Sequence, residues 1–180
     1  MNDIKEKEPN ILLLGVCKTP KEQGKFEKES TKKIQILKDF LNSGGDFIDL
    51  DVHNNELKTL KQFEGSKLWL SCHDFNRVPE NIEEIYKLMN MFQPYGVKFA
   101  LTPRTPLELK DFLDFAAANT PKISYYNTVK KPEIIVTTMG EKYGLLGRNE
   151  IEEKKLSWGG FYALSENHTT ANGQKILAET

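Results

Sequence analysis

Short apolar runs alternate along the chain with longer stretches in which apolar residues recur at helical spacing. The runs of strand length are Ile11–Cys17, Phe47–Val52, Leu68–Cys72, Val97–Leu101, Ile123–Tyr126, Ile134–Thr138 and Gly159–Leu164. The stretches with helical spacing are Phe26–Leu41, Pro79–Phe92 and Pro106–Ala118. Strands that alternate with helices are typical of an α/β fold, so we expect a mostly parallel sheet covered by helices.

Two parts of the chain fit this rhythm less well. The charged stretch Asn149–Lys155 is compatible with either a short helix or a solvated loop. The first ten residues are charged and show no apolar periodicity, which predicts a flexible tail. We expect residues 11–180 to form a single domain of ordinary size.

Composition narrows the class of protein. The 180 residues include 25 Lys and Arg against 26 Asp and Glu, so the net charge is −1. A nucleic-acid binder usually carries a clear basic excess, and no polybasic segment or long apolar run points to a membrane. Cys17 and Cys72 lie in or beside apolar runs without CxxC spacing, which predicts buried thiols in a reducing cytoplasm.

Lys98 is the most informative polar residue. It lies within the apolar run Val97–Leu101, and chemistry in parallel α/β folds gathers at the carboxyl ends of the strands. Burial disfavours the charged form of a lysine, and a neutral amine can attack a ketone to form a Schiff base. The alternative is an edge strand on which Lys98 faces water.

His73 follows the run Leu68–Cys72, where a histidine could take and return a proton. The alternative is a structural histidine that bonds a backbone carbonyl. His53 and His168 are weaker candidates, and we expect His168 to be exposed in a loop. Arg148 could clamp a carboxylate with both arms of its guanidinium, or it is a surface arginine.

The sequence gives no sign of a metal or nucleotide site. There is no HExxH motif, no Cys/His cluster and no calcium-binding loop. The segment Met139–Gly144 has two glycines but lacks both the GxGxxG and the Walker patterns. We therefore expect neither a metal nor an organic cofactor.

Taken together, these residues resemble the type I 3-dehydroquinate dehydratases, the Schiff-base dehydroquinases of the shikimate pathway. Ser71–Phe75 resembles the family's S-x-H-D-F, and Val97–Ala100 resembles its V-K-I-A, in the family's order. Supporting segments are Lys18–Glu22, Asp46–Asp51, Met139–Arg148 and Gly173–Gln174. The resemblance runs from about residue 11 to residue 176.

The resemblance implies a TIM-like (β/α) barrel that dehydrates 3-dehydroquinate to 3-dehydroshikimate without a cofactor. Lys98 would form the Schiff base, His73 would be the general acid and base, and Glu22 would lie near His73. The residues implied in substrate binding are Arg148, Gln174, Thr170 and Lys18.

The chain also departs from the family's pattern. The match begins at the family's third strand, so we expect an incomplete barrel of about six of the eight βα units. The open edges could be covered by the N-terminal tail, by a loop segment or by a second copy in a homodimer. Single positions differ as well: Lys18 replaces an arginine, Gln23 a glycine, Gly147 a serine and Thr170 a serine.

Two other functions stay open at this point. One is a non-catalytic, degenerate domain that binds a quinate-type metabolite, which the departures favour. The other is a Schiff-base enzyme of the aldolase type that acts on another small keto acid, which would share Lys98 but would not require His73. Absorbance of the enone product after addition of 3-dehydroquinate distinguishes all three.

Overall fold

The computed structural model describes residues 2–7, 9–22, 24–27, 30–53, 61–63, 67–120, 132–157, 162–163 and 175–176. The chain divides into two compact units. The first consists of Met1–Ser71 and Met89–Tyr95, and the second of Cys72–Leu88 and Gly96–Thr180. The strands of the main sheet are ordered β1-β2-β3-β4-β5, which is also their order in the chain.

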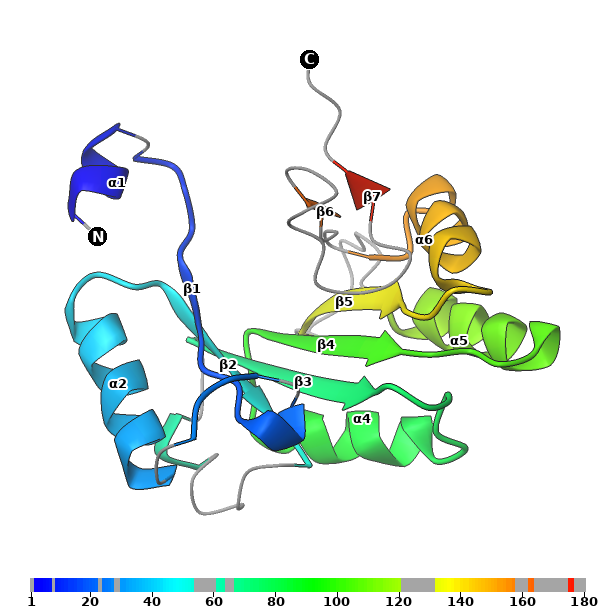
Figure 1. Cartoon of the computed structure of the whole chain (residues 1–180), viewed down its shortest axis with the longest axis horizontal. Helices are drawn as coiled ribbons and strands as arrows, with labels where there is room; N and C mark the ends of the chain where they lie inside the picture. Colours follow the sequence, from blue (N-terminus) through cyan, green and yellow to red (C-terminus); the bar gives the residue numbers. More distant parts are fainter. Residues whose placement is uncertain are drawn as a thin grey trace, which may run out of the picture. The chain divides into compact units, whose positions relative to one another are not determined.

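The first unit is built around parallel strands with one long helix against them (Figure 1). Its elements are α1 (Asn2–Lys7), β1 (Leu14–Val16), the 3-10 helix η1 (Pro20–Glu22), α2 (Ser30–Asn42), β2 (Phe47–Asp51), the 3-10 helix η2 (Lys61–Phe63) and the start of β3 (Leu68–Asp74). Leu14 is in register with Phe47, and Ile48 with Leu68. Helix α2 packs against β1 and β2.

The second unit repeats this arrangement with its own strands and helices. Its elements are most of α4 (Ile82–Asn90), β4 (Gly96–Leu101), α5 (Pro106–Asn119), β5 (Glu133–Thr138), α6 (Gly144–Glu153), β6 (Tyr162–Ala163) and β7 (Lys175–Ile176). Strands β4 and β5 pair in parallel from Gly96↔Glu133 to Leu101↔Thr138. Helices α5 and α6 pack on each other and on β5 (Figure 1).

Local sequence explains where α5 begins. The Thr105 side chain accepts a hydrogen bond from the Glu108 N–H, and Pro106 follows at the first turn, where its missing N–H costs nothing. The Phe112 side chain of this helix is fully buried, and Phe115 packs edge-on against Phe99 of β4 with 5.0 Å between ring centroids. These rings form an aromatic cluster within the core of the second unit.

In β2 both faces of the strand are buried. Side chains alternate along a strand, so Ile48 and Leu50 share one face and Asp49 and Asp51 the other. All four are almost wholly buried, at 2% exposure or less. The apolar pair belongs to the core, whereas the two carboxylates need polar partners to be buried at all.

Most of the expected elements are confirmed. The runs Phe47–Val52, Leu68–Cys72, Val97–Leu101 and Ile134–Thr138 form β2, β3, β4 and β5, and the three helical stretches correspond to α2, α4 and α5. The run Ile11–Cys17 gives a shorter strand, β1. The run Ile123–Tyr126 lies outside the described residues, and Gly159–Leu164 is described only at β6. The charged stretch Asn149–Lys155 lies in helix α6 as far as Glu153.

The N-terminal segment contains a short helix that the sequence analysis did not expect, and the flexibility of residues 1–10 stays a prediction. Asn2–Lys7 form α1, and Lys5 Nζ lies 2.8 and 2.7 Å from the two carboxylate oxygens of Asp46. The Asp46 carboxylate also accepts a hydrogen bond from the Leu13 N–H. Apolar periodicity does not reveal this helix, because the contact described for its side chains is an ion pair. The single domain over residues 11–180 stays a prediction.

Candidate functional site

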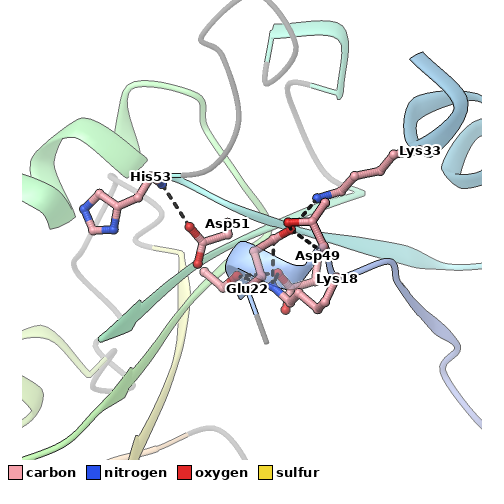
Figure 2. A network of polar contacts seen from close by, with 8 residues as sticks. Lys18, Glu22, Lys33, Asp49, Asp51 and His53 are labelled. Carbon is pink, nitrogen blue, oxygen red and sulfur yellow. Dashed lines mark hydrogen bonds and ion pairs between the residues drawn. The ribbon is translucent and has the colours of Figure 1, made fainter. Parts of the chain in front are cut away.

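Five polar side chains from five segments meet in the first unit. The Lys18–Glu22 cluster, as we call it, comprises Lys18, Glu22, Lys33, Asp49 and Ser71 (Figure 2). Lys18 follows β1, Glu22 ends η1, Lys33 lies on α2, Asp49 on β2 and Ser71 on β3. The cluster thus brings together two of the predicted site residues, Lys18 and Glu22.

Lys18 is held by partners within this cluster. Its Nζ lies 3.2 Å from Asp49 Oδ1, 3.1 Å from Ser71 Oγ and 3.6 Å from Glu22 Oε1. The Ser71 hydroxyl donates a hydrogen bond to the same Asp49 oxygen at 2.5 Å. The ammonium group therefore compensates the buried charge of Asp49, and a substrate group that binds Lys18 has to compete with these contacts.

Glu22 is fixed by the turn that carries it. Its Oε2 accepts hydrogen bonds from the Thr19 N–H at 2.9 Å and the Thr19 hydroxyl at 2.8 Å, and the Glu22 N–H donates to the Thr19 carbonyl. The bond from the Thr19 N–H to the side chain three residues later is one half of a helix capping box. The Lys33 ammonium donates to the same Oε2 at 2.9 Å, and only 1% of the Glu22 side chain is exposed.

Asp51 and His53 lie at the carboxyl end of β2. The Asp51 side chain is fully buried, and its Oδ1 accepts a hydrogen bond from the His53 N–H at 3.0 Å. Figure 2 shows the His53 ring turned away from the Lys18–Glu22 cluster. The contact fixes the turn that follows the strand.

His73, in the second unit, is partly buried near the end of β3. Its ring is nearly parallel to that of Phe75, with 6.2 Å between the centroids. The neighbouring Asp74 carboxylate accepts hydrogen bonds from the backbone N–H groups of Asn76 and Arg77. Asp74 therefore stabilises the turn that leads out of β3, which limits where the His73 ring can lie.

Lys98 is partly buried in the middle of β4, between the fully buried side chains of Val97 and Phe99. Phe99 packs against Phe115 of α5, so by alternation Lys98 points to the face of β4 opposite that contact. Strand β4 lies between β3 and β5 in the sheet. The alternative that Lys98 occupies an edge strand is therefore wrong.

Arg148 is anchored by the end of strand β5. Its Nε donates a hydrogen bond to the Thr138 carbonyl at 3.0 Å, and the Thr138 hydroxyl donates to the Gly144 carbonyl at the start of α6. Lys98 is in register with Ile135 of β5. Thr138 follows three residues later, or roughly 10 Å further toward the carboxyl end of the sheet. The guanidinium is thereby fixed on the side where chemistry is expected.

The structure describes some of the remaining candidate residues but not others. Thr170, Gln174 and His168 lie outside the described residues. Cys72 is fully buried as predicted, whereas Cys17 is partly buried, and burial raises the pKa of its thiol. No three His, Cys, Asp or Glu side chains of the described residues are grouped to bind a metal. Among the same residues no helix is long and apolar enough to cross a membrane.

Two charged residues of the cluster, Lys33 and Asp49, were not singled out from the sequence. A signal for each was present. Lys33 lies four residues before the buried Leu37, on the apolar stripe of α2, and Asp49 lies between the buried Ile48 and Leu50. A charged side chain in a position that the pattern assigns to the core needs a specific partner.

Solved structures confirm the fold. The 3-dehydroquinate dehydratase of Geobacillus kaustophilus HTA426 superposes with a TM-score of 0.76 at 16% identity, covering 97% of this chain and 67% of that one. The type I 3-dehydroquinate dehydratase of Clostridium difficile gives 0.72 at 22% identity, covering 97% and 68%. The fold is thus of the α/β TIM-barrel type, as the sequence predicted.

Sequence comparison then defines the family. Residues 1–148 match the family model of the type I 3-dehydroquinases. The 3-dehydroquinate dehydratase of Streptococcus thermophilus is 29% identical over 177 residues, covering 98% of this chain and 74% of the relative. That of Streptococcus agalactiae is 24% identical over 169 residues, covering 93% and 70%. The chain belongs to the type I 3-dehydroquinase family, and the predicted resemblance is confirmed.

Proposed function

We propose that this chain dehydrates 3-dehydroquinate to 3-dehydroshikimate through a Schiff base on Lys98. Family membership supports the reaction, and the named relatives are 3-dehydroquinate dehydratases. The observation that carries the covalent step is the position of Lys98, a lysine in an inner strand between two fully buried side chains. Such a partly buried amine has less hydration to lose when it attacks a carbonyl.

The proposed reaction can be written with the side chains of this chain and water alone. The Lys98 amine adds to the C3 ketone, and loss of water gives a protonated imine. The imine withdraws electrons from C2, so His73 can remove the C2 proton as a general base. His73 then protonates the C1 hydroxyl as it leaves, and hydrolysis of the imine releases 3-dehydroshikimate and restores Lys98. Neither a metal nor an organic cofactor takes part.

The remaining candidates would orient these groups. Glu22 would orient and tune His73. Arg148, with Gln174 and Thr170, would hold the substrate's carboxylate and hydroxyl groups, because a guanidinium binds a carboxylate bidentately. Lys18 would act near the same groups, although Asp49 and Ser71 already hold its ammonium group. We also keep the proposal that two copies of the chain pair as a homodimer.

Reduction with borohydride in the presence of 3-dehydroquinate tests the proposal directly. We expect a stable adduct on Lys98, located by mass spectrometry of peptides, and Lys98→Ala should lose both the adduct and turnover. Lys87, an exposed lysine on α4, provides the matched control, and Lys87→Ala should retain both. Unchanged turnover in Lys98→Ala, or an adduct on another lysine, contradicts the proposal.

A non-catalytic domain that binds a quinate-type metabolite is the second candidate. The departures from the family's pattern at Lys18 and Gly147 favour it. In that case 3-dehydroquinate would bind without formation of the enone. Absorbance of the enone after mixing with the wild-type protein separates the two functions.

A further inference from the structure

Lys33 is a charged residue in a position where an apolar one is expected. It lies on α2, and only 2% of the residue is exposed, close to the 1% of Leu37 one turn later. Burial of a lysine is unfavourable unless its charge is paired. The partner is Glu22, whose Oε2 lies 2.9 Å from Lys33 Nζ. These two side chains form an ion pair that is almost wholly withdrawn from water.

Lys33 and Lys18 each donate a hydrogen bond to a different buried carboxylate. Lys18 is within hydrogen-bond distance of Asp49 and Ser71, but it lies 3.6 Å from the nearer Glu22 oxygen. Lys33 is the lysine that donates a hydrogen bond to Glu22. Loss of Lys33 would therefore leave Glu22 as a buried carboxylate without a directly bonded cation.

The two oxygens of Glu22 have different surroundings. Oε2 accepts hydrogen bonds from the backbone and hydroxyl of Thr19 and from Lys33. Oε1 is buried and accepts no hydrogen bond from any described residue. A buried acceptor without a donor is costly, so such atoms often await a partner that is supplied during function.

We propose that Lys33 is a positioning residue, which together with Thr19 fixes Oε2 of Glu22 and leaves Oε1 to accept one further hydrogen bond. This rests on the proposed function, in which Glu22 orients His73. In that proposed role, a carboxylate held in one position stabilises the imidazolium that forms when His73 takes the C2 proton. Lys33 therefore acts on the proton transfers that follow the imine and not on imine formation.

Three variants test this role. Lys33→Met keeps most of the side-chain volume and removes the charge, whereas Lys33→Arg keeps the charge. Lys32→Met is the matched control, because Lys32 is the exposed neighbour on the same helix. For Lys33→Met we expect a kcat about 10- to 100-fold lower, as for loss of assistance to a general acid–base group. Its KM should stay within about threefold, because it removes no contact to the bound substrate.

The same variants separate positioning from general damage. In Lys33→Met the borohydride-trapped adduct on Lys98 should still form at the wild-type rate, and deuterium at C2 of the substrate should slow turnover more than in the wild type. Lys33→Arg should have a kcat between those of Lys33→Met and the wild type, and Lys32→Met should have the wild-type kcat. A wild-type kcat in Lys33→Met, or an equal loss of adduct formation, overturns the proposal. If Lys33→Met does not fold, Lys33→Gln provides the uncharged variant.

A measurement without substrate distinguishes this inference from the proposed function. The ¹³C resonance of the Glu22 carboxylate should move in Lys33→Met and stay in place in Lys32→Met. If the wild-type protein does not turn over 3-dehydroquinate, the proposed function fails, and this resonance alone decides whether Lys33 fixes Glu22. An unmoved resonance in Lys33→Met overturns the pairing itself.

Discussion

A Cβ atom on Gly147 would lie 2.5 Å from Oγ1 and 2.6 Å from Cγ2 of Thr138. Helix α6 thus approaches strand β5 this closely only because residue 147 lacks a side chain. The neighbouring Arg148 uses this approach to bond the Thr138 carbonyl. The departure from the family's serine at this position therefore has a steric reason, because Thr138 fills the space that a serine side chain would occupy.

Replacement of Gly147 by serine should move Arg148. We expect Gly147→Ser to lower the free energy of unfolding by about 1–3 kcal/mol through overpacking. It should also raise KM for 3-dehydroquinate more than it lowers kcat, since Arg148 is proposed to bind the carboxylate. The double variant Thr138→Ala/Gly147→Ser should bring KM part of the way back to the wild-type value. Leu145→Ala, on the exposed side of α6, should change neither KM nor kcat. A wild-type KM in Gly147→Ser would argue against this account.

His73 and Lys98 should separate the reaction into two stages. His73→Ala should still form the imine, because Lys98 supplies the nucleophile, but it should stall before elimination. The measurement is the borohydride-trapped adduct on Lys98, which should accumulate while the enone absorbance stays at background. Loss of the adduct in a folded His73→Ala protein would show that this division of roles is wrong.

The ion pair between Lys5 and Asp46 should make the docking of α1 depend on pH. The hydrogen bond from Lys5, and then that from the Leu13 N–H, holds the pKa of the Asp46 carboxyl below its usual range. Its contribution to stability is therefore present above about pH 4 and is lost as the pH falls through the lowered pKa. We expect Asp46→Asn to cost about 0.5–1 kcal/mol at pH 7.

The cost of Asp46→Asn should shrink as the pH falls through the lowered pKa of the wild-type carboxyl, because the wild-type side chain then loses its charge as well. Urea unfolding of both proteins at pH 7 and at a pH below that lowered pKa measures this difference. Lys7, a basic residue of the same helix, serves as the control, and Lys7→Ala should show no such pH dependence. An equal cost of Asp46→Asn at both pH values would point to lost packing in place of lost charge.

Two adjacent glycines after α2 should respond differently to substitution. Gly44 has a φ of +98° and open space around its Cα, so Gly44→Ala should cost about 1 kcal/mol through backbone strain alone. Gly44→Asn should cost less, since asparagine tolerates this conformation better. At Gly45 a Cβ would overlap the ring of Phe40. Gly45→Ala should therefore be relieved by Phe40→Leu, and Gly44→Ala should not; urea denaturation measures each change.

Periodicity predicted the elements whose stability comes from burial. Strands β4 and β5 read as near-continuous apolar runs, and α5 carries both a capping threonine and an N-terminal proline. Helix α1 and the extent of α6 were missed. Helix α1 has no apolar stripe. Helix α6 has a mostly exposed, charged surface, and its packing on β5 depends on the absence of a side chain at Gly147.

The candidate site could be predicted only where a motif marked it. Lys98 and His73 stand out because they interrupt or follow apolar runs within recognisable family segments. Lys33 belongs to no such segment, and its role depends on which side chain meets it across space. A pattern along one helix shows that Lys33 is in a core position, but it does not name Glu22 as the partner.

The alternation within β2 has a consequence for how the chain acquires its fold. Ile48 and Leu50 face one way, and Asp49 and Asp51 the other. A slip of the strand by a single residue would exchange the two sets, burying carboxylates in the aliphatic layer and leaving the Lys18 ammonium without Asp49. The buried Asp49 that holds the Lys18 ammonium thereby also disfavours misaligned pairings during folding, so its removal would loosen the alignment of the sheet as well as release Lys18.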